Sequence, residues 1–305
     1  MSIVAVGSIA FDTVSSPSGS VEGVLAGALT YFAIAASYFT DVRLVAVVGE
    51  DFGPEHEDVF KRHHIDIRGV EHAKGKTFRW GGHYLENLNE AKTDFTELNV
   101  FESFQPRIPA EYQDSQFLFL ANIHPTLQAQ VRQQMNRVQL TGGDTMNYWI
   151  NRTPQELAET LKLINILLIN DTETKMLAHD ATLPRAARKV LTMGPQVLVV
   201  KHGEYGATVF SREGQFGSHP FRAPALPIEE VKDPTGAGDS FAGGFMGYIA
   251  SRDQLNREVL KRALFYGGVM GSFAVEQFGT ERLQSLTREE IEARFQIFRE
   301  LTHLE

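Results

Sequence analysis

The sequence contains no cysteine, which excludes disulfide bonds and thiolate metal sites but does not fix the compartment. It also lacks any run of about 20 apolar residues, and no basic segment precedes an apolar one at its start. We therefore expect no transmembrane helix, no signal peptide and a cytoplasmic location.

Blocks of basic residues are absent too, and 38 Asp and Glu against 29 Lys and Arg give a net charge of −9. We therefore expect neither nucleic acid nor a membrane as a partner. An anionic cosubstrate such as ATP would need a local pocket of backbone amides, a metal ion and one or two cationic side chains. The hydrophobic content of 43% is ordinary for a globular chain, and 305 residues suffice for a large core.

The most informative stretch is residues 233–245, DPTGAGDSFAGGF, which predicts a tight turn that feeds a helix. Small residues at Gly236, Ala237 and Gly238 would let backbone N–H groups at the helix start approach an anion. Asp239 would repel that anion, so its presence indicates chemistry, because a carboxylate there can take a proton from a hydroxyl. The alternative is a helix start that Asp239 or Ser240 merely caps, with glycines for close packing.

Two common glycine motifs are missing from this stretch. A dinucleotide fingerprint would need a third glycine where Phe241 stands, and a P-loop would need lysine in place of Gly244. Hydride transfer with a nicotinamide cofactor is therefore a poor interpretation of the sequence.

As a whole, residues 233–245 closely resemble the C-terminal signature of the PfkB carbohydrate kinase family, which has a ribokinase-like fold. The resemblance implies that Asp239 is the catalytic base and that the amides of Gly236, Ala237 and Gly238 form an anion hole. It also implies a phosphotransferase that uses ATP and Mg²⁺ and acts on a hydroxyl of a small polyol.

Other residues carry the resemblance on the nucleotide side. Asn170 and Glu173 match the family's Asn-x-x-Glu motif, which helps to place Mg²⁺ and its waters; one Glu and one Asn suffice for this ion. Lys201 and Gly203 begin a glycine turn that resembles the nucleotide loop, where Lys201 can neutralise phosphate charge or simply reach solvent. Phe278 lies in a turn that borders the adenine pocket in the family.

Some members of the family bind a monovalent cation at the positions of Asp233 and Thr235. The resemblance therefore makes K⁺ an optional cofactor. Thr235 is also expected on the nucleotide side, since it belongs to the same signature.

On the acceptor side, an apolar strand at residues 3–6 is followed by Asp12, which holds substrate hydroxyls in the resembled family and would otherwise be a turn residue. Gly27 opens a small apolar helix, and Tyr31 stands where the family usually has Asn. The Tyr31 ring can stack on a base, contact a cyclitol or belong to the core. Asn122 ends a buried strand at the sheet edge where such folds bind ligands.

The element order is typical of an α/β fold. Apolar strands at residues 117–121, 163–169 and 197–200 alternate with helical stretches. The resemblance implies one ribokinase-like domain over residues 1–305, with three α/β/α layers and a mostly parallel central sheet.

Residues 77–101 depart from this pattern, because β-forming residues cluster there and predict a hairpin. The resemblance implies a small β-strand lid, formed by about residues 13–22 and 75–103, which in some members clasps a second subunit, so a homodimer is an open expectation. Arg79 can reach the substrate from this lid or stack on Trp80.

The resemblance specifies the reaction better than the acceptor. Sugar, nucleoside and cyclitol kinases share the scaffold, so a carbohydrate kinase is the leading interpretation, with an adenosine-like nucleoside kinase or a myo-inositol kinase as the alternative. Trp80 and Tyr31 favour a flatter acceptor such as a nucleoside. A non-catalytic ligand sensor is a further alternative, because fold does not fix function.

Overall fold

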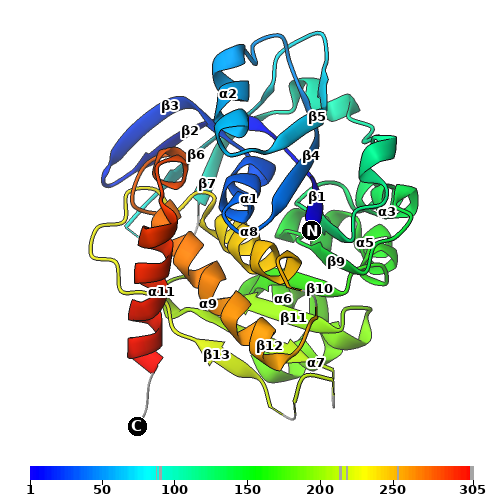
Figure 1. Ribbon diagram of the computed structural model, residues 1–305, viewed down its shortest axis with the longest axis vertical. Helices are drawn as coiled ribbons and strands as arrows, with labels where there is room; N and C mark the ends of the chain where they lie inside the picture. Colours follow the sequence, from blue (N-terminus) through cyan, green and yellow to red (C-terminus); the bar gives the residue numbers. More distant parts are fainter. Residues whose placement is uncertain (87, 89–90, 213–214, 218, 253, 303–305) are drawn as a thin grey trace.

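The computed structural model describes residues 1–302 except 87, 89, 90, 213, 214, 218 and 253. Its larger sheet has nine strands in the order β13-β12-β11-β10-β9-β8-β1-β4-β5 (Figure 1). All neighbours from β11 to β5 are parallel, whereas β12 and β13 run antiparallel to theirs. The strands are β1 (Ser2–Val6), β4 (Asp41–Val48), β5 (Asp66–His72), β8 (Phe117–Leu120), β9 (Leu140–Gly143), β10 (Ile166–Asn170), β11 (Val197–Lys201), β12 (Ala207–Ser211) and β13 (Phe221–Ala223).

Helices cover both faces of this sheet because successive strand residues point to opposite sides. In β1, Ile3 and Ala5 join one buried cluster, and Val4 and Val6 join another. The first cluster includes residues of α1 (Ala28–Ser37), α2 (Pro54–Arg62), α8 (Ala237–Ala250), α9 (Arg257–Ala274), α10 (Glu281–Gln284) and α11 (Arg288–Thr302). The second includes residues of α3 (Pro125–Gln134), α4 (Asn147–Arg152), α5 (Pro154–Leu161), α6 (Asp171–Ala178) and α7 (Leu183–Thr192).

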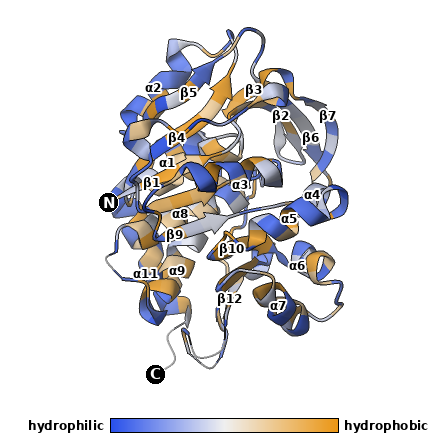
Figure 2. Ribbon diagram, turned by 90° about the vertical axis from the view of Figure 1, so that its right-hand side faces the viewer, coloured by the Kyte–Doolittle hydropathy of each residue, from blue (hydrophilic) through white to orange (hydrophobic). Residues whose placement is uncertain are grey.

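The predicted α/β/α architecture with a mostly parallel sheet is therefore confirmed. Figure 2 shows hydrophobic residues along α1 and α8 inside, and hydrophilic residues on the outer helices α2 and α5. One strand boundary was wrong: the strand predicted at residues 163–169 begins at Ile166. The N–H groups of Leu163 and Ile164 instead donate to Thr160 and Leu161, so these apolar residues belong to the turn after α5. In the part of the chain that the structure describes, no helix has the length and apolar character that crossing a membrane requires.

A second sheet has four strands in the order β3-β2-β6-β7, namely β2 (Ala10–Ser16), β3 (Gly19–Ala26), β6 (Phe78–Tyr84) and β7 (Ala91–Glu97). It projects from the upper left of the molecule in Figure 1. The antiparallel pair of β6 and β7 matches the predicted hairpin, while Val100 and Phe101 belong to a 3-10 helix, Asn99–Ser103. The connection between the two strands includes residues 87, 89 and 90, which lie outside the described residues.

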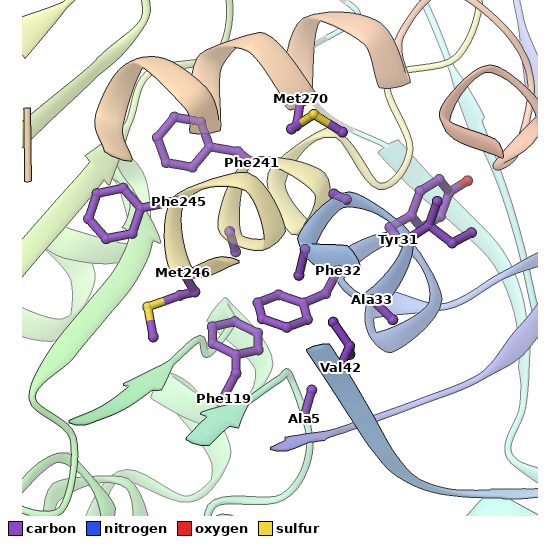
Figure 3. Close-up of a cluster of buried hydrophobic side chains, with 14 of the residues drawn as sticks. Ala5, Tyr31, Phe32, Ala33, Val42, Phe119, Phe241, Phe245, Met246 and Met270 are labelled. Atoms are coloured by element: carbon purple, nitrogen blue, oxygen red, sulfur yellow. The ribbon is translucent and has the colours of Figure 1, made fainter. Parts of the chain in front are cut away.

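Helix α8 lies between α1 and α9 and consists largely of small residues (Figure 3). A side chain at Gly243 would approach the Phe32 carbonyl oxygen to 2.4 Å, and one at Gly244 would approach the Tyr266 carbonyl oxygen to 2.6 Å. Phe32 stacks on Phe119 of β8, with ring centroids 3.9 Å apart, and so fixes α1 to the sheet. The glycines of the signature therefore hold the start of α8 at a defined place above the strand ends.

Candidate active site

The carboxyl ends of β9, β10 and β11 bring three polar residues together. Asn170 and Lys201 occupy paired positions at the ends of β10 and β11, and Asp144 follows β9 directly. The Lys201 ammonium lies 3.3 Å from the Asp144 carboxylate, and both side chains are largely buried. Parallel strands thus place these groups at one edge of the sheet, as the sequence predicts for Asn170 and Lys201.

The turn before α8 is held by Asp233, which is fully buried. One oxygen of its carboxylate accepts the Thr235 N–H at 2.9 Å, and the other accepts the Gly279 N–H at 3.0 Å. Gly236 then begins the helix with a φ of 73°, a conformation that favours glycine. Asp233 and Thr235 therefore form the turn itself, and the structure leaves their predicted role in cation binding as a prediction.

The predicted anion hole lies at the start of α8. The N–H of Ala237 donates to the Pro234 carbonyl at 3.2 Å, so this amide belongs to the turn. Gly238 lies beside Lys201, since a side chain at Gly238 would come within 3.1 Å of the Lys201 ammonium. The first N–H groups of a helix have no partner within the helix, so an anion at this point meets both the helix start and a cation.

Asp239 stands in the first turn of α8, close to Asp144, Lys201 and Glu173. Burial, reinforced by the charge of Asp144 and opposed by Lys201, raises the pKa of Asp239 to about 7. A carboxylate whose pKa lies near neutrality is matched to accepting a proton in a reaction at that pH.

Asn170 and Glu173 form a reciprocal capping box at the start of α6. The Asn170 side-chain oxygen accepts the Glu173 N–H, and Glu173 Oε2 accepts the Asn170 N–H, both at 2.8 Å. Glu173 Oε1 makes no hydrogen bond within the described part of the chain, and burial raises the pKa of Glu173 to about 7. Within the described residues, no group of three His, Asp or Glu side chains is placed to hold a metal ion.

A cleft of about 850 Å³ lies next to this edge. Asn170, Lys201 and Gly203 line it together with Ala237 and Gly238. Other walls come from residues 223–231, from α9 and the Val275 that follows it, and from Glu86 and Leu88 between β6 and β7. Phe278 does not line this cleft, because its ring packs against Gly19 at the β2–β3 turn.

Asp12 follows the strand at residues 3–6, as predicted, and lies in β2 of the small sheet, which begins at Ala10. Its role in holding substrate hydroxyls stays a prediction. Asp12 is 5% exposed, and its Oδ1 has no hydrogen-bond partner among the residues that the structure describes. Burial, with the charges of Asp233 and Asp239, raises its pKa to about 8.

Tyr31 is 1% exposed, and within the described part of the chain its hydroxyl also lacks a hydrogen-bond partner. A side chain on Gly236 would lie 2.4 Å from the Tyr31 ring, so the ring packs directly on the turn before α8. Figure 3 shows Tyr31 pointing away from Phe32 and Phe119. Burial, with the charges of Asp233, Asp12 and Asp239, raises the pKa of Tyr31 well above its usual value, so the hydroxyl stays protonated. Tyr31 thus belongs to the core and also packs against the turn that precedes α8.

Three further residues were predicted to lie near the acceptor, and each has its own surroundings: Gly27, Arg79 and Asn122. Gly27 has a φ of 94°, and a side chain there would approach the Ser8 carbonyl oxygen to 2.6 Å. Arg79 pairs with Asp51 at 3.1 Å and lies over Phe11, not over Trp80. Trp80 instead donates to Thr93 at 3.3 Å. The Asn122 side-chain amide donates to the Met146 sulfur, and its oxygen accepts the Trp149 indole N–H.

Sequence reasoning missed two residues of the site. Asp144 holds Lys201, and Tyr84 of β6 accepts a hydrogen bond from the Thr235 hydroxyl at 3.2 Å. Asp144 follows the same pattern as Asn170 and Lys201, a polar residue directly after a strand. Tyr84 had no local signal, because only the pairing of β2 with β6 brings it to the turn.

Comparison with known proteins identifies relatives of this arrangement. The model of the pfkB family carbohydrate kinases matches residues 3–286. A cytidine kinase from Thermococcus kodakarensis is 30% identical over 282 residues, which cover 86% of this chain and 97% of that protein. The structure of a nucleoside kinase from Methanocaldococcus jannaschii has a TM-score of 0.77 at 19% identity, covering 97% of this chain and 98% of that one. A protein from E. coli assigned as ribokinase II and solved with ATP and Mg²⁺ also has a TM-score of 0.77, at 20% identity over 97% and 99% of the two chains.

Proposed function

Because the chain belongs to the pfkB family of carbohydrate kinases, we propose that it transfers the γ-phosphate of ATP to a hydroxyl of a sugar, free or within a nucleoside. The family predicted from residues 233–245 is confirmed, and with it a phosphotransferase that acts on a sugar or nucleoside hydroxyl. The observation that carries the proposal is Asp239, a carboxylate with a pKa raised to about 7 between a helix start, Lys201 and the acceptor-side Asp12.

In the proposed reaction, Asp12 holds the acceptor through hydrogen bonds to its hydroxyls. As the acceptor oxygen forms a bond to the γ-phosphorus, the bond from that phosphorus to the β–γ bridging oxygen breaks and ADP leaves. The hydroxyl proton passes to the Asp239 carboxylate. Phosphoryl transfer needs positioning and charge balance more than a strong base, so a carboxylate suffices.

On the nucleotide side, the Gly238 N–H and the Lys201 ammonium would hold the charge of the transferring group, and the cleft would hold the rest of ATP. Glu173 Oε1 and the Asn170 side chain are the groups that would hold Mg²⁺, mostly through its waters. This ion would neutralise charge on the phosphate oxygens. The four-stranded sheet would act as a lid that keeps water, a competing acceptor, from the site.

The experiment that tests the proposal measures ADP release with Mg-ATP across free pentoses, hexoses, nucleosides and inositols. We expect one acceptor class to raise the rate, and Asp239→Asn to lower kcat by about 10³, the order of a general-base contribution, with ATP binding within a few-fold. Asp171→Asn is the matched control, because Asp171 also stands in the first helical turn after a strand but pairs with Lys175. Full turnover in Asp239→Asn would contradict its role, and ATP binding without any acceptor response would favour a ligand sensor.

A further inference from the structure

A group of aromatic and polar side chains lies between Asp144 and the body of α4, outside the site described so far. Its members form what we call the α4 aromatic cluster: Asn122, His124, Met146, Tyr148 and Trp149. Tyr148 is 52% exposed and Met146 36%, so the cluster presents apolar surface to solvent. Contiguous exposed apolar surface marks a binding site more often than single scattered apolar residues do.

The cluster is held in a defined arrangement. The Trp149 indole N–H donates to the Asn122 side-chain oxygen at 2.9 Å, and the Asn122 amide donates to the Met146 sulfur at 3.0 Å. His124 and Tyr148 meet Trp149 edge to face, with ring centroids 5.0 and 4.8 Å away. Asn122 thus acts as a positioning residue for Trp149, which differs from the direct substrate contact predicted from the sequence.

The position of the cluster is fixed relative to the reacting groups. Gln128 donates to the carbonyl oxygens of Leu120, Ala121 and Asp144 at 3.3, 2.9 and 3.0 Å, which ties the ends of β8 and β9 together. Met146 lies two residues after Asp144 in the chain, and Asp144 is the partner of Lys201. Figure 2 shows α4 on the same side of the molecule as β6 and β7.

The cluster lies outside the 850 Å³ cleft. None of its residues lines that cleft, whose walls come from β10 to β13, α8, α9 and the β6–β7 connection at Glu86 and Leu88. Its strand β8 instead neighbours β1, whose chain continues to Asp12. A ligand whose hydroxyls reach Asp12 and Asp239 would therefore extend its other end along the ends of β8 and β9.

We propose that the α4 aromatic cluster binds a planar ring carried by the acceptor, so that the acceptor is a nucleoside whose base contacts Trp149 and Tyr148. This inference rests on the proposed kinase function and narrows its acceptor class. Aromatic side chains bind bases through their faces and edges. A free sugar would leave the cluster uncovered.

The chain offers a direct test, because Trp80 and Trp149 are its only tryptophans. In Trp80→Phe, the remaining emission reports Trp149; in Trp149→Phe, it reports Trp80 on the lid sheet. We expect cytidine and inosine to quench the emission of Trp80→Phe, since contact with a base quenches indole fluorescence, and free ribose to leave it unchanged. Quenching confined to Trp149→Phe would place the base under the lid and overturn the proposal.

Kinetics provide the second readout. Trp149→Ala and Tyr148→Ala are expected to raise the KM for the nucleoside acceptor about tenfold while the KM for ATP stays within twofold. Ile297→Ala is the control, because Ile297 is an exposed apolar residue on α11. An unchanged nucleoside KM in both variants would overturn the proposal. Ribose-dependent ADP release without nucleoside quenching would overturn it and leave the kinase function intact, whereas quenching by nucleosides without any ADP release would support the binding site and contradict the kinase.

Discussion

The nucleotide side and the acceptor side of the site differ in how their polar groups are paired. On the nucleotide side, Lys201 is paired with Asp144, and Asn170 and Glu173 satisfy each other in a capping box. On the acceptor side, Asp12 Oδ1 and the Tyr31 hydroxyl are buried without a hydrogen-bond partner in the described structure. On the nucleotide side each of these residues has a partner before any ligand arrives, with Glu173 Oε1 left free, whereas two buried atoms of the acceptor side have no partner within the described residues.

This difference has an energetic consequence. A buried polar group without a partner costs about 1–3 kcal/mol, and more when it is charged. The acceptor side therefore stores unfavourable energy that the hydroxyls of a bound acceptor would relieve. Burial and like charges raise the pKa of Asp12 to about 8. On the nucleotide side burial also raises the pKa of Glu173, to about 7, but there the cation Lys201 opposes the shift.

The largest expected effect is on the acceptor side alone. In Asp12→Ala, the acceptor loses its hydrogen bonds to the Asp12 carboxyl group, worth about 1.5–3 kcal/mol each where that group is ionised, so above pH 8 its KM should rise roughly 100-fold or more. The KM for ATP and the slow hydrolysis of ATP without acceptor should change little. Steady-state kinetics with each substrate varied in turn measure this, and an equal rise of both KM values would remove the distinction between the two sides.

The converse change on the nucleotide side is Lys201→Met, which should raise the KM for ATP roughly 10- to 30-fold and leave the acceptor KM within twofold. This variant also leaves Asp144 buried without its cation, so it should unfold at lower temperature. The double variant Lys201→Met with Asp144→Leu separates the two effects. It should recover thermal stability without recovering ATP affinity; recovery of both would show that Lys201 acts only as a structural partner.

The contrast also decided what the sequence could predict. The nucleotide side follows from short motifs next to strands: residues 233–245 predicted the turn and α8, and the Asn-x-x-Glu spacing placed Asn170 and Glu173 at the end of β10. These features are local, because each motif occupies one strand end and the helix that follows it. Their catalytic and binding roles remain predictions.

The acceptor side depends on contacts between distant segments, and there prediction was weaker. Asp12 lies in a strand of the small sheet, and Tyr84 reaches Thr235 only through the pairing of that sheet. Asp144 went unassigned because its strand, β9, ends in two glycines. Side chains at Gly142 and Gly143 would meet Met246 and Ile164 at 2.6 Å, so packing from far along the chain explains this weak strand signal.

The pH dependence tests the link between the two sides. Asp239 must be ionised to accept a proton, and its pKa is raised to about 7 in the free protein. We therefore expect kcat/KM to fall about tenfold per pH unit as pH drops well below 7, with a plateau above it. Because Lys201 lowers the pKa of Asp239, Lys201→Met should shift this profile toward higher pH. A profile that stays unchanged in Lys201→Met would show that the cation does not act on the base.

The smallest expected effect is a change in the pH dependence of unfolding, and it reports on the unpaired Asp12 carboxyl group alone. Its pKa is about 8 in the folded protein and near 3.8 in the unfolded chain, so unfolding releases a proton between these values. Stability contributed by this group therefore falls as pH rises from about 4 to 8, by a total on the order of a few kcal/mol. Asp12→Asn removes this loss, because an amide does not ionise and keeps the shape of the side chain. We expect the variant to melt several degrees above the parent protein at pH 8 and at nearly the same temperature at pH 4.5, as measured by calorimetry without ligands. A stabilisation of equal size at both pH values would mean that the gain comes from packing, and the acceptor side would then not store the energy of a buried charge.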